Sequence, residues 1–169
     1  MKRVLLPVDR AGHCDAAVKH LIKEFNTNTA MEIHLLNVQS PFNGDIARFV
    51  SRKALREYHR EEGEKVLMQV RKQLDAVGIP YCSHVEVGKR AETITHAARR
   101  LQCNLILMST SRKNSFTRLV EDSVTNHVLE LTDGPVELIA GQSMSKWERY
   151  GIPAAIASLL AMVLATAVD

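Results

Sequence analysis

The sequence predicts an α/β fold: a single domain with a doubly wound, mainly parallel sheet of five strands, followed by an extra C-terminal helix. Two observations support this prediction. Short apolar runs alternate along the chain with longer segments of helical periodicity, and parallel strands require such crossover helices on both faces of the sheet. A chain of 169 residues is also long enough to bury the core of such a domain.

The first half of the chain provides two strands and two helices in this prediction. The apolar run 3–8 indicates a short buried strand, and 33–38 indicates the second. A helix between them ends at 26–29, and after a loop at 40–44 a long amphipathic helix ends at 78–80. The stripe of the first helix is Ala16, Ala17, His20, Leu21 and Phe25, and that of the second is Val66, Val70, Leu74 and Val77.

The second half repeats the alternation of strand and helix. Residues 81–87 alternate well enough for a third strand, 105–108 form the fourth, and 136–139 form the fifth after a turn at 133–135. Two helices lie between these strands. Their apolar positions are Ala91, Ile94, Ala97, Ala98 and Leu101 for one, and Val124, His127, Val128 and Leu131 for the other.

The candidate ligand site follows from this topology, because such sheets bind ligands at the carboxyl ends of their strands. Those ends are marked by residues 7–9, 38–39, 87–88 and 108–112. The last of them opens a loop, 109–123, that is rich in hydroxyl and cationic side chains and leads into a helix. Loops in this position usually hold phosphate, but this one contains no glycine.

Composition argues against several other classes of protein. The net charge of +3 is spread over the chain, and nearby glutamates dilute the cations of 48–60, so that a solvated helix face is a better interpretation than a nucleic-acid surface. The three cysteines are odd in number and far apart, which fits free thiols in a reducing compartment. Cys82 and Cys103 fall in or near predicted core elements, and we expect them to be inert, whereas Cys14, in a loop or first helical turn, is the candidate for a reactive thiol.

No metal or catalytic site can be placed from spacing. The seven histidines show no paired spacing with Cys or carboxylate residues that would form a tetrahedral site, and in the one tight group, 13–15, Asp15 is explained as a helix cap. Asp9 and Asp122 would both face the crevice. A pair of carboxylates there could serve a hydrolase, but salt links and helix capping are the better interpretation of these two residues. Three methionines are interpreted as core filler: Met31, Met68 and Met108. We therefore expect no metal, no catalytic residue and no enzyme.

Six segments carry a family resemblance when they are taken in order. They are VLLPVD, LLNV, VEVG, NLILMS, RLVEDSV and GPVELI. The set resembles the universal stress protein family, bacterial and archaeal α/β domains of the Rossmann-like, adenine-nucleotide hydrolase-like superfold. The resemblance covers residues 2–141. It implies a stress-response or regulatory module in a domain at 1–142, and a homodimer that pairs through the edge strand Val136 to Ile139.

The nucleotide-binding members of that family carry a spaced glycine motif, and this chain has lost it. The motif positions fall on Ser109, Arg112, Asp122 and Ser123, so that only the final hydroxyl is retained. The adenosine side is kept. If binding is retained, the resemblance implies a nucleotide site made of Pro7, Val8, Asp9, Val38, Met108, Ser109, Arg112, Asp122, Ser123 and Val124.

Physical reasons make the lost glycines costly for ATP. Glycine lets backbone amides approach phosphate closely, and a Cβ at Ser109 or Arg112 narrows that approach. The Asp122 carboxylate would occupy the positive end of the next helix and repel a polyphosphate by on the order of 4 kcal/mol per charge pair at 4 Å before screening. We therefore expect weak or absent ATP binding.

Two alternatives stay open for the same crevice. The first is an ATP-binding switch or weak ATPase that uses Asp9, the loop 109–118 and Ser123, because cationic and hydroxyl side chains can replace backbone amides as phosphate ligands. The second is a site for a small anion or metabolite, with the cationic loop as its receptor.

The C-terminal segment Ile152 to Val168 carries no charge. As a helix its 17 residues would span about 25 Å, the short limit for a bilayer core. Trp147 and Tyr150 precede it as interfacial aromatics would, and nearby cations suit the cytoplasmic side. We expect 143–169 to be a linker and an apolar helix that anchors a cytoplasmic domain to the inner face of a membrane. A helix packed within an oligomer is the alternative.

Overall fold

Five parallel strands and the helices between them make up the described part of the chain. The computed structural model describes residues 1–10, 14–42, 50–110 and 124–140. Along the chain the elements are β1 (Lys2–Pro7), α1 (Asp15–Thr27), β2 (Met31–Gln39), α3 (Arg52–Asp75), β3 (Cys82–Val87), α4 (Arg90–Arg100), β4 (Leu105–Thr110), α5 (Val124–Leu131) and β5 (Val136–Ala140). This alternation confirms the predicted fold class.

The sheet reverses its winding direction between β1 and β4. Its strand order is β3-β2-β1-β4-β5, and every neighbouring pair is parallel. The chain therefore winds outward from β1 to β3 on one side and from β4 to β5 on the other, with β1 and β4 side by side at the centre. Residue Val4 is in register with Leu105 there. The fifth strand lies at an edge, as the sequence predicted.

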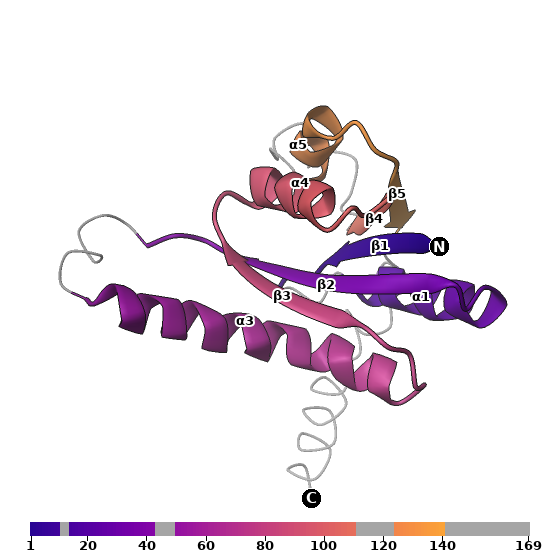
Figure 1. Ribbon diagram of the computed structural model, residues 1–169, viewed down its shortest axis with the longest axis horizontal. Coiled ribbons are helices and arrows are strands. Elements are labelled where there is room, and N and C mark those ends of the chain that lie inside the picture. Colours follow the sequence, from indigo (N-terminus) through magenta and orange to yellow (C-terminus); the bar gives the residue numbers. More distant parts are fainter. Residues whose placement is uncertain (11–13, 43–49, 111–123, 141–169) are drawn as a thin grey trace, which may run out of the picture.

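Helices cover both faces of this sheet. Figure 1 shows α1 and α3 on one face and α4 and α5 on the other. The strands alternate accordingly, since Val4 and Leu6 belong to the core beneath α1 and α3 whereas Leu5 belongs to the core beneath α4 and α5. The same period of two recurs in β4, where Leu105 and Leu107 face the first core. The apolar runs are thus buried on both sides, as a parallel sheet requires.

The long helix α3 approaches β3 closely at Gly63. An added Cβ at this position would lie 2.4 Å from Cγ1 of Val85. No side chain fits in that gap without movement of its neighbour, so this glycine sets the spacing between α3 and the edge strand.

The predicted apolar stripe of α3 is wrong at its last position, Val77. The helix ends at Asp75, and Gly78 adopts a positive φ of 68° that lets the Ile79 amide bond back to the Leu74 carbonyl at 3.0 Å. This turn buries Ile79 and leaves Val77 half exposed, outside the helix. Leu67 takes the buried place on the stripe instead.

Further side chains are more exposed than the sequence suggested. Met68 lies on the outer side of α3 and is 46% exposed, so it is not core filler. Cys82 is exposed because it begins an edge strand, which has a neighbour on one side alone. Leu131, expected on the buried stripe of α5, is 42% exposed because that helix presents Val128 to the core.

The described ranges contain no candidate for a membrane-spanning helix. None of the helices within residues 1–10, 14–42, 50–110 and 124–140 combines the length and the apolar character needed to cross a bilayer. The apolar segment 152–168 and the loop positions Arg112, Asp122 and Ser123 lie outside the described residues.

Candidate functional site

The candidate site lies where β1 and β4 end side by side. Doubly wound sheets bind their ligands at this point, because the connections from the two strands diverge and leave a crevice. Pro7 ends β1, and Val8 and Asp9 follow it, while Met108 and Ser109 lie near the end of β4. The structure thus brings together residues that are about a hundred positions apart in the sequence.

A buried asparagine fixes the backbone just after β1. Asn37 of β2 is 3% exposed, and its Nδ2 donates to the Val8 carbonyl at 2.8 Å. Its Oδ1 accepts from Gln39 Nε2 at 2.6 Å, and the Val8 amide donates to the Leu36 carbonyl at 2.8 Å. Sequence reasoning did not assign this role to Asn37. The signal was an amide beside the apolar residues Leu35, Leu36 and Val38, since a buried amide needs partners.

Ser109 of β4 caps helix α1. The Ala17 amide, in the first turn of the helix, donates to Ser109 Oγ at 3.2 Å. The local N-cap residue is Cys14, and within the described residues its side chain makes no capping bond. Asp15 was expected to be the cap, but it is the first helical residue. A side chain from a strand far along the chain therefore supplies the acceptor that the local sequence lacks.

Three of the predicted adenosine-side residues lie together on the opposite face of the sheet. Val38, Met108 and Val124 all belong to the core beneath α4 and α5. Met108 is 8% exposed, and the two valines are partly buried against it. They form an apolar floor at the carboxyl ends of β2 and β4, where α5 begins.

Among the described residues, two carboxylates lie near Cys14, which follows β1 and precedes α1. Burial first, and then the carboxylates of Asp15 and Asp9, raise the pKa of the Cys14 thiol to about 11. Cys14 is thus a buried thiol, protonated near neutral pH, and the reactive-thiol hypothesis is not supported. The nearby cation, Arg10, forms an ion pair with Glu62 of α3.

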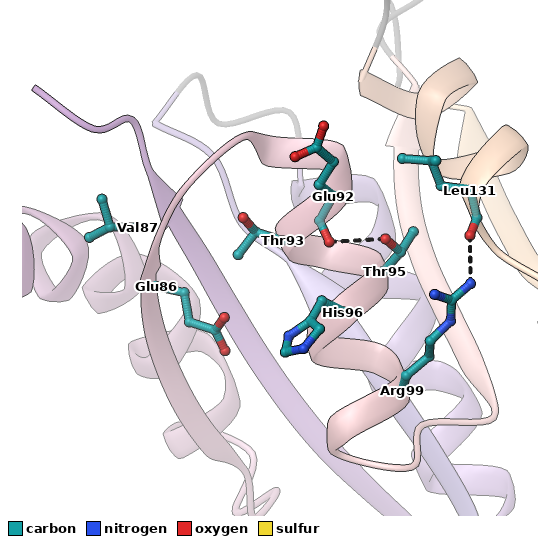
Figure 2. Close-up of a pocket in the computed structure, with 8 residues that line it drawn as sticks. All are labelled: Glu86, Val87, Glu92, Thr93, Thr95, His96, Arg99 and Leu131. Carbon is teal, nitrogen blue, oxygen red and sulfur yellow. Dashed lines mark hydrogen bonds between the residues drawn. The ribbon is translucent and has the colours of Figure 1, made fainter. Parts of the chain in front are cut away.

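A second hollow lies on the outer side of α4 and has a volume of about 510 Å³. Figure 2 shows Glu86 of β3 and His96 of α4 extending into it. Two other polar side chains that line it form hydrogen bonds within the protein. Thr95 Oγ1 donates to the Glu92 carbonyl at 3.0 Å, and Arg99 donates to the Leu131 carbonyl at 2.9 Å. The crevice between β1 and β4 remains the better candidate for ligand binding.

A histidine pair joins β2 to β3. His34 is buried, and its Nδ1 lies 3.1 Å from Nε2 of His84, so one ring donates and the other accepts. Burial first, and then His34 and Arg100, lower the pKa of His84. The lowered pKa favours the neutral imidazole of His84.

The fold defines a class of protein: a doubly wound α/β domain whose switch point lies between β1 and β4. Within that class the chain belongs to the universal stress protein family, since the model of the Universal stress protein family matches residues 1–139. It is thus a stress-response module of that family.

Individual relatives agree with this assignment. Universal stress protein MJ0531 of Methanocaldococcus jannaschii is 29% identical over 141 residues, which cover 82% of this chain and 81% of that protein. The solved structure of MJ0577, from the same organism, has a TM-score of 0.66 at 26% identity and covers 85% of this chain and 98% of its own.

A second solved structure resembles the chain in its fold. A universal stress protein family protein from Arabidopsis thaliana with AMP bound has a TM-score of 0.61 at 16% identity, with 85% of this chain and 94% of that chain covered.

Proposed function

We propose that the module is non-catalytic and that its crevice binds ATP weakly or not at all. The observation that carries this proposal is the bond from the Ala17 amide to Ser109 Oγ. In nucleotide-binding relatives a glycine stands at this motif position and gives phosphate access to the backbone. Here a Cβ and a hydroxyl occupy it, and the oxygen accepts a structural hydrogen bond.

Electrostatics support the same proposal. Asp15 lies close enough to Cys14 to raise the pKa of its thiol, so a carboxylate is present in the first turn of α1. Asp122, two residues before α5 begins at Val124, would add a carboxylate at the helix N-terminus that a phosphate otherwise occupies. Each such pair of like charges at about 4 Å costs on the order of 4 kcal/mol at intermediate dielectric before screening.

An ATP-binding switch or weak ATPase is the second candidate function. The apolar floor of Val38, Met108 and Val124 favours it, because these residues can pack against a base. The Arabidopsis relative with AMP bound shows that the family fold accommodates an adenine nucleotide in that protein. In this candidate Arg112, Ser123 and the other polar side chains of the loop would replace the missing glycine amides.

Equilibrium titration separates the two candidates. The unmodified full chain is titrated with ATP, with and without Mg²⁺, and with AMP. Weak ATP binding predicts no saturation at micromolar ATP and no gain on adding Mg²⁺, and AMP should bind at least as well as ATP. Saturation at micromolar ATP, or steady ATP hydrolysis, would refute the proposal.

Two variants test the reason for weak binding. Replacing Arg112 and Asp122 together by glycine should strengthen ATP binding by at least about tenfold, that is by about 1.4 kcal/mol. Asp133→Gly is the matched control, since it removes an exposed carboxylate in the turn after α5. The double change leaves the net charge unaltered, so a gain from Asp133→Gly as large as the gain from the double change would show that net charge, and not the loop, limits binding.

Assembly is the next part of the proposal. We propose a homodimer in which β5 pairs with its copy, because β5 is an edge strand with hydrogen-bonding groups on its outer side. Leu138, which is 40% exposed on that strand, adds apolar surface to the pairing. Replacing Leu138 by lysine should convert the dimer to a monomer in sedimentation. A wild-type chain that is monomeric at high concentration would contradict the proposal.

Membrane tethering rests on the sequence alone. We propose that 143–169 is a linker and apolar helix that holds the domain at the inner face of a membrane. Deleting 143–169 should release the protein from the membrane fraction. A full-length protein that is monodisperse without detergent would contradict tethering and favour a helix packed within an oligomer.

A further inference from the structure

Three potential metal ligands from α1 and β5 converge at one place. They are His20, Glu24 and Glu137, and one ligand atom from each lies within 4.8 Å of the others. His20 Nε2 is 2.9 Å from Glu137 Oε1 and 3.9 Å from Glu24 Oε2. All three side chains are about one-third exposed, so an ion can reach them from solvent.

The fold fixes this convergence. His20 and Glu24 are four residues apart on α1 and therefore lie on the same face of the helix. Glu137 is in register with Leu107, whose side chain belongs to the core beneath α1. Side chains of neighbouring strands in register point to the same face, so Glu137 faces α1 as well. Sequence reasoning had the first pair available in its spacing, but Glu137 is more than a hundred residues away.

One carboxylate oxygen of Glu24 forms an ion pair, and the other has no hydrogen-bond partner among the described residues. Lys2 forms an ion pair with Oε1. Oε2 is buried and has no hydrogen-bond partner within the described residues, although it points toward His20. With a neutral imidazole, the two glutamates and the single lysine carry a net negative charge. A buried anionic oxygen beside an imidazole is costly unless a cation satisfies it.

We propose that His20, Glu24 and Glu137 bind a divalent transition-metal ion of the Zn²⁺ type. One imidazole nitrogen and two carboxylate oxygens are the three protein ligands of an open zinc site, with the fourth position left for water. The imidazole favours Zn²⁺ over Mg²⁺ and Ca²⁺, which prefer oxygen ligands. The site lies apart from the crevice between β1 and β4, and it ties α1 to the edge strand β5.

The same contacts have a simpler interpretation, in which a protonated His20 bridges two carboxylates as an ion pair. The two interpretations differ in their response to metal. An ion pair needs no cation, so added Zn²⁺ would neither bind at this place nor change stability. A metal site would exchange the imidazole proton for the ion and would resist unfolding in its presence.

The test is titration of the full chain, freed of metal by chelation, with Zn²⁺, and with Co²⁺ as a spectroscopic probe. Calorimetry should give one strong site per chain, and Co²⁺ should develop visible absorption bands typical of four-coordination. His20→Ala and, separately, Glu137→Gln should each weaken Zn²⁺ binding by at least about tenfold. His96→Ala is the matched control, because His96 is an exposed histidine on α4, outside this group. This variant should bind Zn²⁺ with the affinity of the parent.

Stability measurements make the outcome decisive even if a variant folds poorly. Zn²⁺ should raise the thermal midpoint of the parent and of His96→Ala, and leave that of Glu137→Gln unchanged. If the parent shows no Zn²⁺ binding tighter than about 1 mM, or if His20→Ala and His96→Ala lose affinity equally, the proposal is wrong and the group is an ion pair.

Discussion

Replacing Ser109 by alanine removes one hydroxyl from the end of β4 and takes the acceptor away from the Ala17 amide. That amide lies in the first turn of α1, where no carbonyl of a preceding helical turn is available to it. Ala17 is fully buried, so water cannot take the place of the hydroxyl. The change therefore tests whether the position of the lost glycine now has a structural role.

The cost follows from the burial of the amide. Losing an N-cap acceptor costs about 1 kcal/mol on average. Leaving a buried donor without a partner raises this to about 1–3 kcal/mol. For a chain of this size each kcal/mol corresponds to a fall in Tm of about 2–4 °C. We expect Ser109→Ala to lower the free energy of unfolding by about 2 kcal/mol.

Ser51 offers a matched control. Its hydroxyl also accepts from a backbone amide at a helix N-terminus, that of Ala54 in α3, at the same distance of 3.2 Å. Ala54 is exposed, so water replaces the hydroxyl, and Ser51→Ala should cost about 0.5–1 kcal/mol. Urea unfolding followed by circular dichroism measures both variants. A loss for Ser109→Ala no larger than that for Ser51→Ala would refute the structural role assigned to Ser109.

Three further predictions concern packing, protonation and thiol chemistry. Gly63→Ala should destabilise the fold by about 1–3 kcal/mol despite its better helix propensity, because the new Cβ would meet Val85, and adding Val85→Ala should recover much of the loss in urea unfolding. Folding lowers the pKa of His84 below its ordinary value of 6.5, so the unfolded chain binds this proton more tightly than the folded chain does. The free energy of unfolding should therefore reach its full value above pH 6.5 and fall on acidification, by at most about 1.4 kcal/mol per pH unit. His84→Asn should flatten this pH profile. Iodoacetamide near neutral pH should modify the exposed Cys82 well before the buried Cys14, as peptide mass spectrometry can show; faster reaction at Cys14 would contradict its raised pKa.

The alternation of elements was predictable because it depends on local pattern. Apolar runs such as Val4 to Leu6 and Leu105 to Leu107 are buried on both faces, and each indicates a parallel strand without knowledge of its neighbours. The helices between them follow from spacing in the same way. Burial at the ends of elements was less predictable, because Val77 and Leu131 have the right periodicity but lie where a helix has ended or faces solvent.

The sequence also predicted that the ends of β1 and β4 meet, since strand ends in a doubly wound sheet meet at one edge. The loss of glycines in the loop that follows β4 is implied by the family resemblance. The sequence did not indicate what replaced them. A cap was expected from Asp15, a neighbour in sequence, whereas the acceptor comes from Ser109, ninety-two residues away from the amide it serves.

What the sequence determined by itself is therefore the order of strands and helices, the family, and the loss of the phosphate-binding glycines, because each depends on residue type and local spacing. Tertiary structure alone decided which distant side chains meet. Ser109 reaches the start of α1, Asn37 holds the residue after β1, and Glu137 joins His20. The physical reason is that strand order and the alternation of faces set these contacts, and neither quantity is written in any single segment of the chain.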